Sequence, residues 1–215
     1  MHKMIGPRKA PKQKRSKERF QKILEVTFET IAEIGYENTT TDLIASRSGI
    51  SVGSLYQFFP NKETIIFAVA EETYLKLHGV FFKKIKPIVE TYRKGKSTKF
   101  TFSLASEILV SFEETMEEVK ENVILQSILY THPKLLELDF KSNERFAKTL
   151  VQELFVPLFP KLSRERSLVI SRMTVEIVDA VYRSLLRNPK SSAVKQRQAI
   201  AELNQLLGFY FQSFR

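Results

Sequence analysis

The chain has 215 residues, of which 43% are hydrophobic, 27% are charged and none is cysteine. A chain of this length and apolar content buries roughly 70% of its unfolded surface, which excludes a globally disordered protein. The missing cysteines exclude disulfides, thiolate metal sites and a cysteine nucleophile, and they fit a reducing compartment. No uncharged stretch is longer than twelve residues, whereas a membrane-spanning helix needs about 18. Because no apolar signal segment follows the basic N-terminus, we expect a cytoplasmic protein that does not enter the membrane.

Positive charge is concentrated in two segments of the chain. Lysine and arginine number 34 against 24 acidic residues, and the net charge of +10 favours polyanionic partners. Residues 1–15 contain six basic residues and no acidic one, together with two prolines and a glycine, and we interpret them as a disordered basic arm. Residues 83–99 contain seven basic residues and one acidic residue; a solvated surface explains this second cluster equally well. Residues 16–66 are slightly acidic, with five basic and seven acidic side chains.

Helices are the only regular elements that the sequence pattern predicts. Apolar residues recur at spacings of three and four, which is typical of an all-α fold. The first predicted helix covers residues 16–34 and carries its apolar residues on one face. It ends at Gly35, which adopts the left-handed conformation of a helix end without steric cost. The second helix begins in a run of threonines, where Thr39 and Asp42 have the spacing of a capping box.

The second and third predicted helices are short and are joined by a tight turn over residues 48–51. Ser51 is a good N-cap for the third helix. Pro60 disfavours helical geometry at the residue before it, so this helix covers residues 52–59. Asn61 caps a longer fourth helix. Two short helices around such a turn match a helix-turn-helix, whose second helix enters the DNA major groove with its N-terminal residues on the bases. An ordinary helical hairpin in a bundle has the same spacing.

The residues of this region resemble a known family. Residues 17–66 contain Gly35-Tyr36, Thr39-Thr40-Thr41, Ile44-Ala45, Gly49-Ile50-Ser51, Gly53-Ser54-Leu55-Tyr56-Gln57-Phe58-Phe59 and Pro60-Asn61-Lys62-Glu63. In this order and without gaps, they resemble the DNA-binding domain of tetracycline-repressor-type (TetR family) regulators. The resemblance covers about fifty residues. It implies a homodimer with an N-terminal three-helix DNA-binding domain and a larger helical domain for a ligand.

The resemblance assigns phosphate contacts to two residues. In such regulators the tyrosine at the place of Tyr56 contacts a backbone phosphate through its hydroxyl, and Lys62 resembles their phosphate-binding lysine. A half-buried packing aromatic is the other interpretation of Tyr56. The backbone amides of Thr40 and Thr41, at the start of the second helix, can add a phosphate contact, although capping alone also explains both threonines.

The exposed face of the third helix is predicted to read bases through Ser51, Val52, Gly53, Ser54 and Gln57. Gln57 has the only long polar side chain on this face, and it can pair with adenine N6 and N7. The helix has no Lys or Arg, so the arginine–guanine contact, the commonest specific one, is missing. Members of the resembled family often have a basic residue at the place of Val52, and this departure weakens the expectation of guanine selection. Val52 is expected to contact a thymine methyl instead.

The second half of the chain is predicted to form further helices. They cover, approximately, residues 100–118, 121–131, 135–157, 163–187 and 192–214. Seventeen Phe and seven Tyr suit a hydrophobic ligand pocket lined by aromatic rings, and they suit a plain hydrophobic core equally well. The candidates for a pocket wall are Phe112, Tyr130, Phe146 and Tyr182, and none of them is assigned singly.

The last two predicted helices carry apolar faces suited to a dimer interface. The final helix has apolar residues at spacings of 3, 4, 3 and 4, the seam of helices that pack lengthwise, and Gly208 beside it permits a close approach. The helix before it is apolar around more than half its circumference and must cover two neighbours. The resemblance implies a four-helix interface between two copies, whereas packing within one chain is the other interpretation. The predicted interface residues are Ile170, Met173, Ile177, Val181, Ile200, Leu203, Leu207, Tyr210 and Phe214.

We therefore predict a basic arm over residues 1–15, a DNA-binding domain over 16–66 with its helix-turn-helix at about 39–58, and an effector-binding and dimerisation domain over 67–215. The predicted function is that of a homodimeric repressor, released from a near-palindromic double-stranded DNA operator by a small hydrophobic ligand, with no metal or other cofactor. A ligand-independent or activating regulator of the same fold is one alternative, and a basic adaptor that binds membrane surfaces through residues 83–99 is another. An enzyme is disfavoured, because the three histidines are scattered and no glycine-rich phosphate loop appears.

Overall fold

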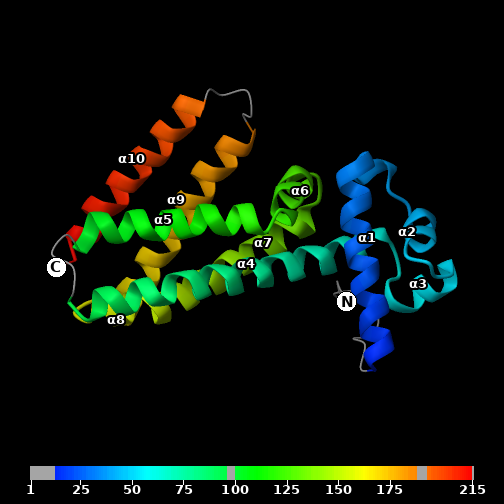
Figure 1. Ribbon diagram of the computed structural model, residues 1–215, viewed down its shortest axis with the longest axis horizontal. Helices are drawn as coiled ribbons and strands as arrows, with labels where there is room; N and C mark the ends of the chain where they lie inside the picture. Colours follow the sequence, from blue (N-terminus) through cyan, green and yellow to red (C-terminus); the bar gives the residue numbers. More distant parts are fainter. Residues whose placement is uncertain (1–12, 96–99, 188–192, 215) are drawn as a thin grey trace. The chain divides into compact units, whose positions relative to one another are not determined.

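A computed structural model of the protein describes residues 13–95, 100–187 and 193–214 (Figure 1). Every regular element within these residues is helical, which confirms the all-α fold class. In chain order the elements are α1 (Lys14–Asn38), α2 (Thr41–Arg47), α3 (Val52–Phe58), α4 (Lys62–Arg93), α5 (Phe100–Glu118), α6 (Glu121–Ile128), η1 (Leu129–Thr131), α7 (Pro133–Leu150), η2 (Val151–Phe155), α8 (Val156–Leu158), α9 (Arg164–Arg187) and α10 (Ala193–Gln212). The helices predicted over 121–131 and 135–157 are each divided, the second by the π-helical turn η2. None of the described helices combines the length and the apolar content needed to cross a membrane.

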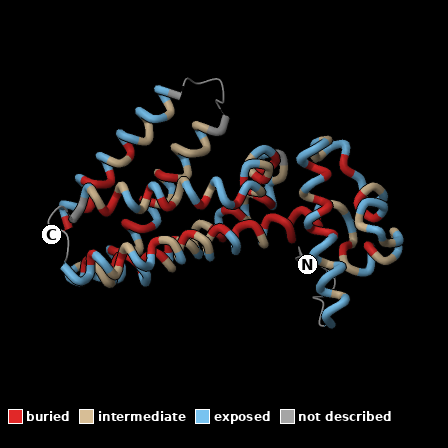
Figure 2. Tube along the Cα trace, in the orientation of Figure 1, coloured by how far each residue is buried: buried red, intermediate tan, exposed pale blue. Residues whose placement is uncertain are grey.

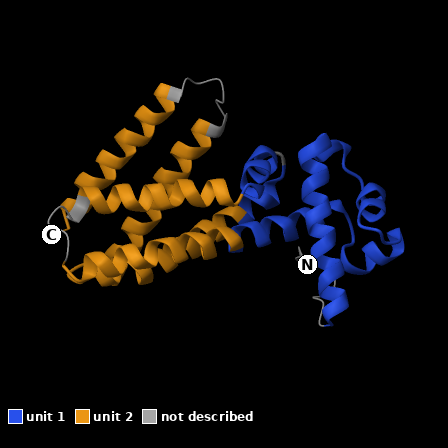
Figure 3. Cartoon of the chain, in the orientation of Figure 1, with its two compact units in different colours: residues 1–75, 120–138 blue, residues 76–119, 139–215 orange. Residues whose placement is uncertain are grey.

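The described residues form two compact units, which Figure 3 colours separately. Unit 1 contains the described residues up to 75 together with 120–138, and unit 2 contains residues 76–119 and those from 139 onward. The first part of α4 belongs to unit 1 and the rest to unit 2. The sequence pattern placed a boundary at residue 66 and carried no signal for the return of the chain to unit 1. Unit 1 is therefore built from two separate stretches of sequence.

A small apolar core holds unit 1 together. Ile23 of α1, Ile44 of α2, Leu55 of α3 and Phe59 are fully buried, and Figure 2 shows buried stretches along these helices in red. Burying side chains of this size stabilises the folded state by about 1.5–3 kcal/mol each. Phe20 of α1 stacks on Phe59 with ring centres 5.0 Å apart. The apolar stripe predicted for the first helix is thus the face that the short helices cover.

Helix α1 extends beyond both predicted limits. It begins at Lys14, so the last residues of the predicted basic arm are helical, and residues 1–12 of that arm lie outside the described residues. The helical geometry breaks at Gly35, whose φ of +79° lies in the left-handed region. Residues with a Cβ rarely adopt this conformation. Glycine is therefore required at the predicted helix stop.

The start of α2 lies one residue later than the capping box predicted. Thr40 is the N-cap, because its Oγ1 accepts a hydrogen bond from the backbone N–H of Leu43 at 3.2 Å. Thr39 is buried and donates its own hydroxyl to the carbonyl of Gly35 at 2.8 Å. That bond ties Thr39 to the preceding helix, so the predicted Thr39 capping box is wrong.

The starts of α3 and α4 agree with the predicted caps. Ser51 Oγ accepts a hydrogen bond from the N–H of Ser54 at 3.2 Å. Asn61 Oδ1 accepts one from the N–H of Thr64 at 2.9 Å. Each bond satisfies a first-turn amide that has no partner within the helix. Helix α4 then continues through Pro87 to its end at residue 93.

Unit 2 is held together by aromatic side chains and by the packing of α10 on α5. Gly208 lies where these two helices meet, since a Cβ at this position would be 2.4 Å from a ring carbon of Phe102. The close approach that the sequence suggested beside Gly208 therefore occurs within one chain. Four buried rings have neighbouring centres 5.7–6.1 Å apart; they are Phe155, Phe159, Phe211 and Phe214.

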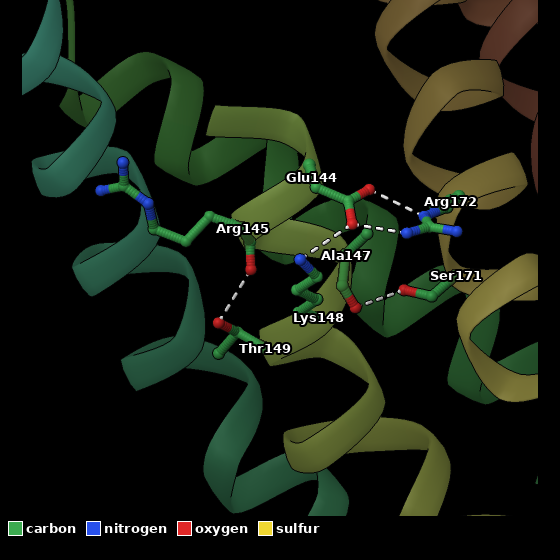
Figure 4. A network of polar contacts seen from close by, with 7 residues as sticks. All are labelled: Glu144, Arg145, Ala147, Lys148, Thr149, Ser171 and Arg172. Atoms are coloured by element: carbon green, nitrogen blue, oxygen red, sulfur yellow. Dashed lines mark hydrogen bonds and ion pairs between the residues drawn. The ribbon is translucent and has the colours of Figure 1, made fainter. Parts of the chain in front are cut away.

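Polar side chains join α7 to α9 within unit 2 (Figure 4). Glu144 of α7 accepts two hydrogen bonds from Arg172 of α9, at 2.7 and 2.5 Å, and lies 3.1 Å from Nζ of Lys148. The guanidinium, and then the ammonium of Lys148, lower the pKa of Glu144 to about 2. The buried hydroxyl of Ser171 donates to the carbonyl of Ala147 at 2.8 Å. An exposed ion pair and a buried hydrogen bond thus hold the same two helices.

Candidate nucleic-acid interface

The turn between α2 and α3 has the geometry of a helix-turn-helix. Gly49 adopts a φ of +67°, and the N–H groups of Ser48, Gly49 and Ile50 donate to carbonyls of α2 at 2.9–3.1 Å. The side chain of Ile50 packs against the core of unit 1, which fixes the direction in which the chain enters α3. The turn therefore holds the two short helices in a fixed arrangement, as groove binding requires.

The predicted base-reading residues lie at the start and on the exposed side of α3. Ser51, Gly53 and Gln57 are exposed, whereas Ser54 is half-buried and shares a 2.8 Å contact between its hydroxyl and that of Ser51. Val52 is half-buried against the core of unit 1, so less of its side chain is available to a thymine methyl than the sequence suggested. Among the predicted residues of α3, Gln57 remains the long polar side chain that reaches solvent.

Hydroxyl groups of α2 and α3 meet beside this surface. Tyr56 is 39% exposed, and its hydroxyl lies 3.2 Å from Oγ1 of Thr41. Thr40 is exposed at the start of α2, where its hydroxyl oxygen caps the helix. Hydroxyl groups contact DNA phosphates as neutral donors. The structure thus places the hydroxyl of Tyr56, predicted to contact a phosphate, at the start of α2, where the backbone amides of Thr40 and Thr41 were predicted to add a phosphate contact.

Lys62 is held by Tyr36 at the end of α1. Its ammonium donates to the carbonyl oxygen of Tyr36 at 2.9 Å and lies 4.1 Å from the centre of the Tyr36 ring. The His132 ring, from the second stretch of unit 1, packs in a T-shaped arrangement with the Tyr36 ring, with centres 4.4 Å apart. Desolvation raises the pKa of the Tyr36 hydroxyl, and the charge of Glu63 raises it further. Lys62 is therefore positioned by a neighbour that the sequence pattern did not associate with it.

A cluster of cations near the turn was missed by the sequence interpretation. A concave surface of about 360 Å³ is lined by Arg15, Glu18, Arg19, Lys22, Ser48 and Ile50. The three basic residues follow one another at spacings of four and three, which places them on one face of α1. This spacing was visible in the sequence, but only the fold brings it next to the helix-turn-helix.

The residues predicted for a dimer interface fall into two groups. Ile170, Leu203, Leu207 and Phe214 are buried within the core of unit 2, so other residues form the surface that is available to a second copy. Met173 is 47% exposed, and the remaining four predicted residues are partly buried; they are Ile177, Val181, Ile200 and Tyr210. Exposed apolar side chains of α9 and α10 that the seam did not include are Val169, Val194, Leu206 and Phe209.

The aromatic residues proposed for a pocket wall also divide. Phe112, Phe146 and Tyr182 pack against the core of unit 2, whereas Tyr130 belongs to unit 1 and is 52% exposed. The hydroxyl of Tyr182 donates to Glu113 at 2.9 Å. Burial, and then this carboxylate, raise the pKa of Tyr182. The Tyr182 hydroxyl and the Glu113 carboxylate thus lie beside aromatic side chains, a combination that is common in ligand pockets.

Unit 2 also has a groove on its surface between α7 and α9. Its volume is about 450 Å³, and it is lined by Phe140, Asn143, Glu144, Arg172, Val175 and Glu176. None of the four predicted wall residues lines this groove. Within the described residues no group of three or more His, Cys, Asp or Glu side chains could hold a metal ion.

Sequence comparisons identify related proteins. The family described as "Bacterial regulatory proteins, tetR family" matches residues 23–69. The chain is 27% identical over 133 residues to the fatty acid metabolism regulator protein of Bacillus subtilis strain 168, which covers 62% of each chain. It is 30% identical over 146 residues to the nucleoid occlusion factor SlmA of Actinobacillus pleuropneumoniae serotype 5b (strain L20), which covers 67% of this chain and 65% of that one. The matches span slightly under two thirds of the length of these relatives.

Solved structures share the fold over nearly the whole chain. The fatty acid degradation regulator FadR from Bacillus halodurans superposes with a TM-score of 0.60 at 16% identity, and covers 93% of this chain and 97% of that one. A TetR-family transcriptional regulator from Streptomyces coelicolor superposes with a TM-score of 0.57 at 18% identity, and covers 92% and 99%. At these identities the similarity establishes the arrangement of the helices.

Proposed function

The chain belongs to the tetR family of bacterial regulatory proteins, and on that premise we propose that it represses transcription by binding operator DNA through α2 and α3. Membership places it among DNA-binding transcriptional regulators and not among enzymes. In the proposed scheme two copies bind a near-palindromic operator, and a small hydrophobic effector in unit 2 releases them.

The observation that carries this proposal is the surface at the start of α2 and along α3. Thr41 and Tyr56 place two hydroxyls 3.2 Å apart, and Gln57 is exposed on the same helix as Tyr56. Hydroxyl donors suit phosphate oxygens, and a glutamine amide suits the paired donor and acceptor of adenine. Backbone and base contacts are thus available on one side of a rigid turn.

Support for a hydrophobic effector comes from the interior of unit 2 and from the relatives. Phe112 and Tyr182 pack with ring centres 4.9 Å apart, and the Tyr182–Glu113 hydrogen bond supplies a polar group beside them. The Bacillus subtilis relative is named for fatty acid metabolism and the Bacillus halodurans protein for fatty acid degradation. A long acyl chain with a polar head is therefore the effector class that we propose to test first.

Support for a homodimer comes from exposed apolar side chains on the last two long helices. Met173 of α9 is 47% exposed, and Leu206 and Phe209 of α10 are 50% and 61% exposed. One reading helix of seven residues contacts only a few base pairs, and a two-fold axis doubles the contacts. A Met173→Glu/Phe209→Glu variant should sediment as a monomer and lose operator binding while unit 2 stays folded. A dimer of unchanged affinity would place the interface elsewhere.

The direct test is a gel shift with DNA from upstream of the protein's own gene. The full chain should retain this DNA against an excess of unrelated duplex, and binding should weaken as salt rises. In parallel, the chain is mixed with anionic phospholipid vesicles. Capture by the vesicles without retention of any DNA would favour the membrane-surface adaptor, and unselective retention would remove the operator-binding function.

The effector is tested by thermal shift with long-chain fatty acids. A ligand at about 100 times its Kd stabilises the folded state by about 2.7 kcal/mol, and under repression with release the same ligand should free the DNA in the gel shift. A rise in melting temperature without release of DNA would indicate an activator. DNA binding that no ligand alters would indicate a ligand-independent regulator.

A further inference from the structure

We propose that α1 carries a second DNA-backbone contact, formed by Arg15, Arg19 and Lys22 beside the turn at Ser48 and Ile50. We call the concave surface that these residues line the α1 cleft. The inference rests on the proposed DNA-binding function and adds a contact outside the helix-turn-helix. The family match begins at residue 23, so the three cations precede the matched residues.

The three cations converge on one concave surface of about 360 Å³. All three are exposed, and their spacings of four and three keep them on the same face of α1. Glu18 is the one acidic residue of the lining, so three positive charges and one negative charge leave a net charge of +2. Lys22 also lies 3.9 Å from Glu25, an exposed pair of a kind that contributes little. The cleft therefore presents a net positive charge to solvent.

The cleft is held in a fixed position relative to the reading helix. Phe20, which lies between the cations in sequence, stacks on Phe59 at 5.0 Å and meets Phe58 edge-on at 6.1 Å. Ile50, which also lines the cleft, packs into the same core two residues before α3 begins. Aromatic packing of this kind resists rotation of α1 about its axis. A phosphate bound in the cleft would therefore stand at a set distance from the base-reading side chains.

The charges around the helix-turn-helix explain why such a contact is needed. Helix α3 has no Lys or Arg, and Arg47 at the end of α2 forms a 2.5 Å ion pair with Glu33 of α1. Arg47 lowers the pKa of the Glu33 carboxyl mainly through this hydrogen bond. The affinity of a DNA-binding domain comes largely from cations that replace counterions at phosphates. In unit 1 the α1 cleft supplies such cations next to the turn.

The lining of the cleft also includes a polar group without a hydrogen-bond partner among the described residues. The hydroxyl oxygen of Ser48 forms no hydrogen bond with any described residue, and Ser48 lines the cleft. A buried hydroxyl without a partner costs free energy, and rotation of the half-buried Ser48 side chain would let it donate to a phosphate oxygen in the cleft. This observation is independent of the cations and favours the same occupant.

The test compares two variants of the full chain that lose the same charge from the same helix. Arg15→Gln/Arg19→Gln removes two cations from the cleft, whereas Lys14→Gln/Lys17→Gln removes two exposed cations from other faces of α1. Binding to a 30-base-pair duplex of arbitrary sequence is measured over a range of salt. For each phosphate contact that the cleft variant loses, the slope of the logarithm of the binding constant against the logarithm of the salt concentration should become shallower by about 0.9. This change corresponds to roughly eight-fold weaker binding at 0.1 M salt. The matched control should keep the wild-type slope.

Two further variants sharpen the result. Glu18→Gln removes the one acid of the lining, so it should strengthen binding, and Arg15→Lys/Arg19→Lys should retain the slope because the charge is kept. Circular dichroism verifies the fold of each variant. Equal decreases of the salt slope in the cleft variant and the matched control, or no decrease in either, would overturn the proposed phosphate contact of the α1 cleft.

The outcomes also separate this inference from the proposed function. Phosphate contacts do not depend on sequence, so the arbitrary duplex tests the cleft whether or not the protein selects an operator. Selective operator binding with unchanged salt slopes in the cleft variant would overturn the cleft alone. Unselective binding that only the cleft variant weakens would overturn the regulator function and support the cleft. A wild-type chain that binds no duplex would overturn both.

Discussion

Buried polar side chains bond within their own helix in both units, and in unit 2 some of them also bond between helices. In unit 1, Thr27 is fully buried and donates its hydroxyl to the carbonyl four residues earlier in its own helix. In unit 2, Thr115 of α5 bonds in the same way within its own helix, but polar groups also bond between helices. Tyr182 of α9 donates to Glu113 of α5, and Arg183 of α9 pairs with Asp139 of α7. Bonds within one helix form with that helix, whereas bonds between helices depend on correct packing. Substitutions inside unit 2 should therefore change stability, and substitutions on the surface of unit 1 should change binding alone.

The largest effect is expected for Arg183→Met. The Arg183 guanidinium lies 2.5 Å from Asp139 and 2.6 Å from Asp179, and its side chain is 12% exposed. Removing it leaves two carboxylates without their cation, a loss of about 3–5 kcal/mol for a buried pair. Urea denaturation measures the loss. The matched control is Arg172→Met, whose exposed pair with Glu144 should contribute little to stability. Similar losses in both variants would contradict a special role for the buried cluster.

A smaller effect of the same kind is expected from the protonation of His78. Burial, and then the charge of Arg145, lower the pKa of His78 to about 4, from about 6.5 in the unfolded chain. The unfolded state therefore takes up a proton below pH 6.5 that the folded state does not accept. The stabilisation is complete above pH 6.5 and is lost as the pH falls towards 4, by about 3 kcal/mol in total. Urea midpoints from pH 7 to 4.5 measure this loss, and His78→Gln should give a flatter curve. Parallel curves for the two proteins would contradict the assignment.

On unit 1 the expected effects concern DNA. Gln57→Ala should lower discrimination at one position of each half-site by about 1–3 kcal/mol, because a glutamine amide that reads DNA pairs with a single base. The unfolding midpoint should stay at the wild-type value, since Gln57 is exposed. Competition gel shifts with operators changed at single positions measure the discrimination. A loss spread evenly over all sequences would identify Gln57 as a backbone contact instead.

The smallest effect is expected for Tyr56→Phe. This change removes one hydroxyl and keeps the ring, so affinity should fall by about 1 kcal/mol on every DNA sequence. Tyr130→Phe, at another exposed tyrosine of unit 1, is the matched control and should bind as the wild type does. Fluorescence anisotropy with two unrelated duplexes measures both variants. Unaltered binding of Tyr56→Phe would return this residue to a packing role.

The helix-turn-helix is the part of the fold that could be predicted most fully from the sequence, because its signals are local. Ser51 and Asn61 cap the helices that follow them, and Gly35 ends the one before. The error at α2 has a physical cause. Thr39 and Thr40 both offer a hydroxyl, and the choice between them depends on a hydrogen bond to the carbonyl of Gly35 that no spacing rule contains.

The apolar faces of the last helices show where local signals fail. A spacing of three and four places Leu203 and Leu207 on one face of α10, but it does not say which helix covers that face. In the structure both are buried in the core of their own chain, and α10 packs on α5. The contact between Lys62 and Tyr36 was missed for the same reason. The two residues are far apart in sequence, and no local pattern around either of them indicates the contact.

Because unit 1 consists of two stretches of sequence, it cannot be moved to another regulator as one continuous segment. Helix α6 packs on α1, and His132 supports Tyr36, which holds Lys62. A chimera joined at residue 75 would carry α1, α2 and α3 of one parent and α6 of the other. Transfer of unit 1 to another protein therefore requires two insertions, because a single crossover would separate α1 from the α6 on which it packs.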